Sequence, residues 1–258
     1  MAKNALVVGG KVGIGGSLVE QLASAGYRVY FTSRGQLPQQ EKDRKEGVIA
    51  IENVNVADPD SVKRIAASIE GIQFDLVIYN AGVLHINPFG EGFDGNKMME
   101  EFQVNTLGPA LVLNALIVGK ALKSGSKVSL ISSGVGIQSV VVKNKMTVAP
   151  GYVVSKAAIN MLGSVLSLVL KESGVAVFNI HPGTVSTNMS SQMGAKAGGK
   201  TGFVDSKGSE YLWLTPQESA ARILATVAAA TIADTGEFFD AITGRKWTFT
   251  TAEGTDDH

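Results

Sequence analysis

The chain has 258 residues with 23 acidic and 23 basic side chains, and its length suits one large α/β domain. The charge balance gives no reason to expect binding to nucleic acid or to an anionic membrane. Cysteine is absent and the three histidines have no ligand spacing, so we expect no disulfide bond, no cysteine nucleophile and no metal site.

The apolar run at the start of the chain is broken too soon by glycine to resemble a signal peptide. No uninterrupted stretch of about 18 apolar residues suggests a membrane span. We therefore expect a cytoplasmic protein without a membrane partner.

Seven short segments rich in apolar and β-branched residues are expected to form strands. They are Ala5–Val8, Val29–Thr32, Val48–Val54, Leu76–Tyr79, Val128–Ile131, Val175–Ile180 and Gly236–Phe239. Most are continuous apolar runs, which is typical of parallel strands covered on both faces. Helical patterns lie between them at 14–25, 59–70, 96–122, 151–172 and 216–230. This alternation predicts an α/β fold of the Rossmann type, a doubly wound seven-stranded parallel sheet with helices on both faces.

The chain shows no internal repeat and no linker. Residues 1–251 are therefore expected to form a single domain. The acidic, glycine-containing segment 252–258 is expected to be a flexible C-terminal tail.

A glycine-rich turn joins the first predicted strand to the first predicted helix. It contains Gly9, Gly13 and Gly15, with Lys11 and Ile14 between them. Glycines allow a tight turn and let the backbone approach a pyrophosphate at the helix N-terminus. In this context the turn predicts a dinucleotide site, and a tight turn without a ligand is the alternative.

The end of the second predicted strand bears on cofactor choice. Sites selective for NAD usually place an acidic residue there to bind the ribose 2′-hydroxyl. This chain has Ser33 and Arg34 instead, with Lys11 in the glycine turn nearby. A guanidinium suits a 2′-phosphate, so we expect NADPH/NADP+ rather than NADH. A solvated charge at the strand end is the other interpretation of Arg34.

Tyr152 and Lys156 are one helical turn apart, so their side chains share a face of the helix. Free tyrosine has a pKa near 10, and a nearby cation lowers it. The pair is therefore a candidate general acid–base. The alternative is a half-buried tyrosine beside a solvated lysine.

More polar and small residues follow later predicted strands, at the sheet edge where ligands bind in such folds. They are Asn80-Ala81-Gly82, Ser133, and Pro182-Gly183 continuing to Thr187. Asn105 lies inside a predicted helix, where asparagine is unfavourable unless its amide has a specific partner.

Together, and in this order along the chain, these residues resemble the short-chain dehydrogenase/reductase family. The ending from Gly236 to Trp247 is similar to its carbonyl-reductase-like branch, related to C-factor and sniffer. The resemblance implies a single dinucleotide-binding and catalytic domain. The cofactor-binding residues that it implies are Gly9, Lys11, Gly13, Ile14, Gly15, Ser33, Arg34, Asn55, Val56, Asn80, Ala81, Gly82, Tyr152, Lys156, Pro182, Gly183, Val185 and Thr187.

The resemblance also implies four catalytic residues. Tyr152 would exchange a proton with the substrate oxygen, and Lys156 would lower the pKa of Tyr152 and bind the nicotinamide ribose. Ser133 would hold the substrate oxygen, and Asn105 would anchor a water in a proton relay.

The chain departs from the family pattern at four points. Val8, Asn55 and Tyr79 replace the usual threonine, aspartate and first asparagine of their motifs. Ser133 precedes Tyr152 by 19 positions, whereas Ser139 precedes it by 13, the spacing common in the family. We expect Ser133 to act, because it ends the strand directly, and 140–148 to form an inserted lip.

These features predict an NADPH-dependent oxidoreductase that reduces a small or medium aldehyde, ketone or quinone to the alcohol. A redox sensor that binds NADP(H) without turnover is the alternative, and an NAD-linked alcohol dehydrogenase is disfavoured by Arg34. The segment 184–214 does not reveal the substrate. The predicted helices 96–122 and 151–172 carry more apolar residues than one core face needs, so we expect a homodimer or homotetramer.

Overall fold

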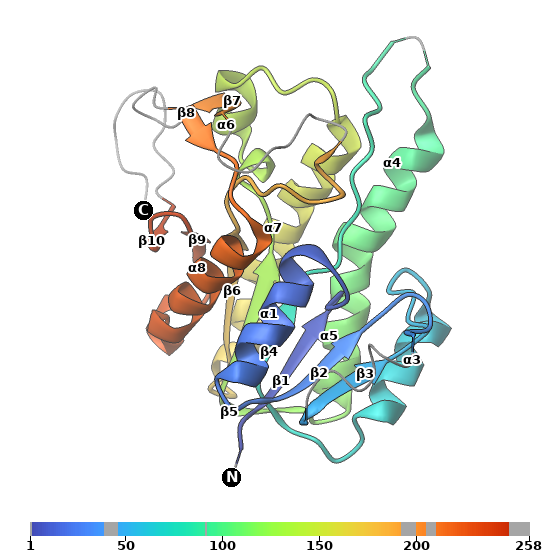
Figure 1. Cartoon of the computed structure of the whole chain (residues 1–258), viewed down its shortest axis with the longest axis vertical. Coiled ribbons are helices and arrows are strands. Elements are labelled where there is room, and N and C mark those ends of the chain that lie inside the picture. The colour runs from blue at the N-terminus through green and yellow to red at the C-terminus, as the bar shows by residue number, and fades with distance from the viewer. Residues whose placement is uncertain (1, 39–45, 91, 192–199, 205–209, 248–258) are drawn as a thin grey trace.

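The computed structural model describes residues 2–38, 46–90, 92–191, 200–204 and 210–247. The predicted tail 252–258 lies outside these residues, so its flexibility stays a prediction. Figure 1 shows the carboxyl ends of the central strands directed toward the end of the molecule that carries α6 and the N-terminus of α4.

Eight strands form the main sheet, in the order β10-β9-β6-β5-β4-β1-β2-β3. They are β1 (Asn4–Val8), β2 (Arg28–Thr32), β3 (Val48–Ile51), β4 (Phe74–Tyr79), β5 (Leu122–Ile131), β6 (Ala176–His181), β9 (Phe238–Asp240) and β10 (Arg245–Lys246). The first seven in chain order are parallel, as predicted, and the two-residue β10 adds an antiparallel edge. A separate antiparallel pair joins β7 (Lys200–Val204) and β8 (Glu210–Leu212).

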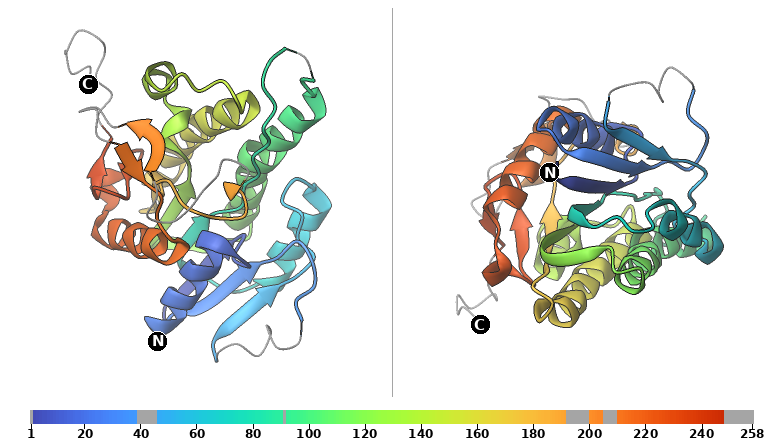
Figure 2. Two further views of the ribbon diagram at one scale, coloured as in Figure 1. Left: turned by 45° about the horizontal axis from the view of Figure 1, so that its top comes forward. Right: turned by 90° about the horizontal axis from the view of Figure 1, so that it is seen from below.

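Helices cover both faces of the sheet. They are α1 (Gly13–Ser24), α3 (Pro59–Ser68), α4 (Gly95–Phe102), α5 (Gly108–Val118), α6 (Gln138–Lys143), α7 (Pro150–Lys171) and α8 (Pro216–Ala229). Figure 2 (right) shows α1 and α8 on one face and α3, α5 and α7 on the other. The predicted doubly wound architecture is therefore confirmed.

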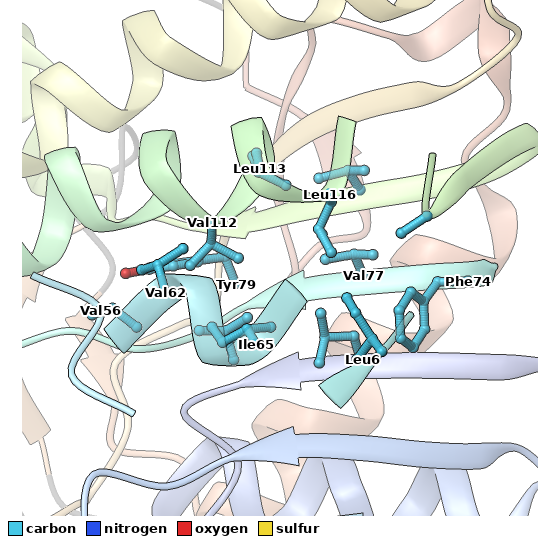
Figure 3. Close-up of a cluster of buried hydrophobic side chains, with 14 of the residues drawn as sticks. Leu6, Val56, Val62, Ile65, Phe74, Val77, Tyr79, Val112, Leu113 and Leu116 are labelled. Carbon is cyan, nitrogen blue, oxygen red and sulfur yellow. The ribbon is translucent and has the colours of Figure 1, made fainter. Parts of the chain in front are cut away.

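Each face of the sheet has its own apolar core. On the α3/α5/α7 side, Leu6, Val77 and Tyr79 pack with Val112 and Leu116 of α5 (Figure 3). The other core lies beneath α1 and α8. Successive side chains of a strand point to opposite faces, so the continuous apolar runs supply both cores.

Two helical stretches, Gly95–Val118 and Pro150–Lys171, are apolar and long enough to cross a membrane by length and composition. This differs from the sequence-based expectation, because isolated polar residues interrupt the apolar runs without removing their average hydrophobic character. Core helices of soluble proteins have the same composition, and Leu116 and Ile159 of these helices are buried in the core.

Candidate active site

The glycine turn between β1 and α1 is packed so closely that side chains are excluded. Gly9 and Gly13 have φ values of 82° and 60°, which favour glycine. A Cβ on Gly15 would overlap the Gly9 carbonyl oxygen, and one on Gly9 would lie 2.8 Å from Ala81 Cα. The turn thus leaves bare backbone at the N-terminus of α1, which suits a pyrophosphate.

Thr32 and Asn80 hold this turn from neighbouring strand ends. Thr32 Oγ1 accepts a hydrogen bond from Gly9 N at 2.8 Å, and Asn80 Nδ2 donates to Gly9 O at 2.9 Å. Val8 cannot form the side-chain bond expected of a threonine at its position. The turn is instead fixed from β2 and β4, and Thr32 was not anticipated from the sequence.

At the end of β2, Ser33 and Arg34 differ in how well they could contact a cofactor phosphate. Ser33 is buried, and its hydroxyl donates to Gly35 O at 2.8 Å. Arg34 is exposed at the rim, and Lys11 is partly exposed. Because the Ser33 proton is already engaged, the cationic side chains are better placed to meet a phosphate.

Asn55 and Val56 follow β3. The family pattern implies that residues at this position contact the adenine of the cofactor. The Asn55 side-chain oxygen accepts from Ala57 N at 3.2 Å, which supports the local turn. The Val56 side chain is buried beside Tyr79 and Gly108, so a cofactor could meet only its backbone.

Tyr152 and Lys156 lie on α7, the first partly exposed and the second buried. Burial raises the pKa of Tyr152 to about 12, opposed by a hydrogen bond with Ser133 and reinforced by Glu101. Burial lowers the pKa of Lys156 to about 8, so the amine is still protonated at neutral pH.

Lys156 is not among the groups that shift the pKa of Tyr152 in this structure, so the expected lowering of that pKa by Lys156 stays a prediction. Lys156 Nζ donates to Ile131 O at 2.9 Å and lies 5.5 Å from the centre of the Tyr152 ring. The ammonium is thus turned toward a backbone carbonyl, and desolvation dominates the pKa of the phenol.

Ser133 follows β5, and its interaction with the Tyr152 phenol lowers the pKa of that phenol. Its Oγ also accepts from Val135 N at 3.3 Å, at the start of a short 3-10 turn. Ser139 is exposed on α6. The structure therefore brings Ser133 to Tyr152 and leaves Ser139 outside, as the sequence led us to expect. The expected lip is partly helical, because α6 occupies residues 138–143.

The backbone around Ser133 is held by residues from distant elements. His181 Nδ1, at the end of β6, accepts from Gly134 N at 3.2 Å. Burial lowers the pKa of His181, with Asp240 acting in the opposite direction, so the neutral ring that can accept this bond is favoured. A Cβ on Gly134 would lie 3.1 Å from the Trp247 ring.

Asn105 lies in a π-helical turn, Gln103–Leu107, between α4 and α5. Its Nδ2 donates to Val83 O and Ser155 Oγ, both at 2.9 Å. Its Oδ1 accepts from Val83 N at 2.8 Å. Both amide hydrogens are thus used, and any bound water would need the remaining lone pair of Oδ1.

Tyr79 explains why the predicted helix 96–122 is interrupted. Its hydroxyl donates to Val104 O at 2.9 Å and occupies the place of a Cβ on Gly108. A side chain inserted into the hydrogen-bond ladder of a helix distorts it. The tyrosine that departs from the family pattern therefore shapes the turn that carries Asn105.

The segment after β6 passes over the glycine turn. Gly183 has φ 86°, and Ser219 Oγ donates to Pro182 O at 2.8 Å. Val185 is bridged to Leu214.

Beyond Val185, this segment reaches two other parts of the candidate site. The Thr187 methyl lies 3.6 Å from the position of a Cβ on Gly13. A Cβ on Gly82 would lie 3.9 Å from Met189 Cε and 3.8 Å from Lys156 Nζ. The residues that were predicted to follow the later strands therefore lie close together at one edge of the sheet.

Comparisons with known proteins agree with this geometry. A family model described as short chain dehydrogenase matches residues 3–198. The 1-hydroxy-2-glutathionyl-2-methyl-3-butene dehydrogenase of Rhodococcus sp. (strain AD45) is 29% identical, with 90% of this chain and 94% of that protein covered. An NADPH-bound carbonyl reductase from chicken fatty liver is 25% identical with a TM-score of 0.80, covering 96% of this chain and 99% of the other. The chain belongs to the short-chain dehydrogenase family.

Proposed function

We propose that this protein is an NADPH-dependent oxidoreductase that reduces a small or medium aldehyde, ketone or quinone to the alcohol. The observation that carries the proposal is the placement of Ser133 close enough to the Tyr152 phenol to lower its pKa, beside buried Lys156 at the sheet edge that holds the glycine turn. A protein that only binds a dinucleotide has no need for this proton-handling group.

The residues of the turn fit a nicotinamide dinucleotide. The bare backbone of Gly9, Gly13 and Gly15 would hold the pyrophosphate, and Arg34 and Lys11 would face a 2′-phosphate. When bound, the cofactor supplies the hydride. The chicken carbonyl reductase, a relative of similar fold, binds NADPH, which supports this choice.

Ser133 would hold the substrate oxygen while the Tyr152 phenol donates its proton to it. A pKa of about 12 keeps the phenol protonated at neutral pH, so it can serve as a donor. Of the three donors of the Lys156 ammonium, one binds Ile131 O, and the others would bind the ribose and stabilise the phenolate formed.

The proposal is tested by following NADPH oxidation with a panel of aldehydes, ketones and quinones. Alcohols with NADP+ should be included, because the Rhodococcus relative is a dehydrogenase. Turnover of one class that is lost in Tyr152→Phe supports the proposal. Tight NADPH binding without turnover of any compound would favour the redox-sensor alternative.

We also propose that the chain forms a homodimer or homotetramer. On α4, Met99 and Phe102 are 55% and 43% exposed, and on α7 Met161 and Leu168 are 67% and 75% exposed. A second copy would bury these apolar side chains. Light scattering at micromolar concentration should give a multiple of the chain mass, and Leu168→Glu should reduce it; a monomer would contradict the proposal.

A further inference from the structure

Glu101 is a buried carboxylate that the proposed mechanism does not use. It lies on α4 with 0% exposure, and burial raises its pKa. Its Oε2 has no hydrogen-bond partner in the part of the chain that the structure describes. Burying a charge is costly unless it is compensated, so this side chain needs an explanation.

The Glu101 carboxylate lies between two segments of the candidate site. Oε1 accepts from His85 N, in the segment after β4, at 2.8 Å. Oε2 lies against Gly151, where it occupies the place of a Cβ. Gly151 is in the first turn of α7 and directly precedes Tyr152. The positive end of a helix dipole favours a carboxylate at this position.

Glu101 acts beside Asn105, one turn further along the same helical stretch. Residues at i and i+4 share a face, and both side chains bind the backbone of the segment after β4. Asn105 holds Val83 through two hydrogen bonds, and Glu101 holds His85. Both also contact α7, but at different places: Asn105 donates to Ser155 Oγ, whereas Glu101 lies against Gly151, directly before Tyr152.

The titratable groups that face Glu101 come from three elements. They are His85 after β4, Glu100 on the same helix and Tyr152 on α7. The His85 ring is directed to Glu100, with Nε2 and Oε2 2.9 Å apart. The charge of Glu101 adds to the effect of burial on the pKa of Tyr152, because a nearby anion disfavours the phenolate.

We propose that Glu101 is a positioning residue of the catalytic centre. It fixes the segment after β4 against the start of α7, and its negative charge widens the pH range in which Tyr152 remains a proton donor. The inference rests on the proposed function, in which Tyr152 is the general acid.

Two substitutions separate the charge of Glu101 from its contacts. Glu101→Gln removes the charge and keeps an oxygen that can accept from His85 N, whereas Glu101→Leu removes both. Glu100→Gln is the matched control, because it removes the same charge one residue away, from an exposed side chain.

The ionisation of Tyr152 can be read without turnover by fluorine NMR of protein labelled with fluorotyrosine. The fluorine lowers every phenol pKa and brings the titration into a milder pH range. The resonance missing in Tyr152→Phe identifies Tyr152. The value of kcat at neutral pH provides the second readout, which reports the placement of the phenol.

Glu101→Gln should lower the Tyr152 midpoint in this titration by roughly 0.5 pH unit, whereas Glu100→Gln should lower it by less than half as much. Glu101→Leu should also lower kcat at neutral pH by about tenfold through misplacement of the phenol, whereas Glu101→Gln should stay within about twofold of the unmodified protein.

An unchanged midpoint in Glu101→Gln would overturn the electrostatic role. Equal kcat values in the Gln and Leu variants would overturn the positioning role. If the unmodified protein reduces no carbonyl compound while the midpoint still shifts, the proposed function fails and the electrostatic role of Glu101 stands.

Discussion

Replacing Ser133 by alanine should reduce kcat strongly while leaving the fold intact. Its hydroxyl interacts with the Tyr152 phenol and would donate to the substrate oxygen as charge develops there. Removing one such donor typically costs roughly 10²–10³ in kcat. The other bond of Ser133, from Val135 N, is long at 3.3 Å, so we expect a loss of less than about 1 kcal/mol in unfolding free energy.

Ser139→Ala is the matched control, since Ser139 is exposed on α6. Surface substitutions of this kind usually change stability by less than about 0.5 kcal/mol, and we expect kcat to remain within about twofold of the unmodified protein. Steady-state rates with a saturating carbonyl substrate, combined with urea unfolding, would compare the two variants. A large loss in Ser139→Ala with little loss in Ser133→Ala would refute the reasoning.

Three further predictions concern stability and cofactor choice. Tyr79→Phe leaves Val104 O without its partner at 2.9 Å and should cost about 1–3 kcal/mol in urea unfolding. Because burial lowers the pKa of His181, the unfolded chain binds a proton more readily below about pH 6.5, so the unfolding free energy should fall there; His181→Asn should flatten this fall. NADPH should be preferred over NADH at least about tenfold, and Arg34→Ala should remove most of this preference, because it removes a charged hydrogen-bond donor.

Each of these predictions has a contradicting result. An unfolding free energy of Tyr79→Phe equal to that of the unmodified protein would mean that the hydroxyl does not support the π-helical turn. The same acid dependence of unfolding in His181→Asn would assign it to other groups. Equal kcat/KM for NADPH and NADH in the unmodified protein would contradict the role of Arg34.

The parallel sheet could be predicted because its strands have a local signature. Segments such as Ala5–Val8 are continuous runs of apolar residues, and in the structure these four are 0% exposed. The edge strand β10 has two exposed residues and therefore no apolar pattern. Segment 138–143 contains three consecutive valines, which disfavour helix, so α6 was not predicted.

The chemistry of the strand ends was visible in the sequence, but the contacts between distant elements were not. Ser133 was preferred over Ser139 because it follows its strand directly. The roles of Thr32 and Tyr79 depend on partners in other elements. Glu101 follows another glutamate in a helical segment, a pattern that is typical of a solvent-exposed helix face. Its burial depends on the packing of α4 against α7, which the sequence does not show.

The most direct test of the central claim is the effect of Tyr152→Phe on kcat and on NADPH affinity. The phenol is the proposed proton donor and contributes little to cofactor binding. Loss of a general acid typically costs roughly 10²–10⁴-fold in rate. We therefore predict a loss of that size in kcat, with an NADPH Kd by fluorescence titration close to that of the unmodified protein. A loss in kcat of less than about tenfold, with cofactor binding intact, would contradict Tyr152 as the acid.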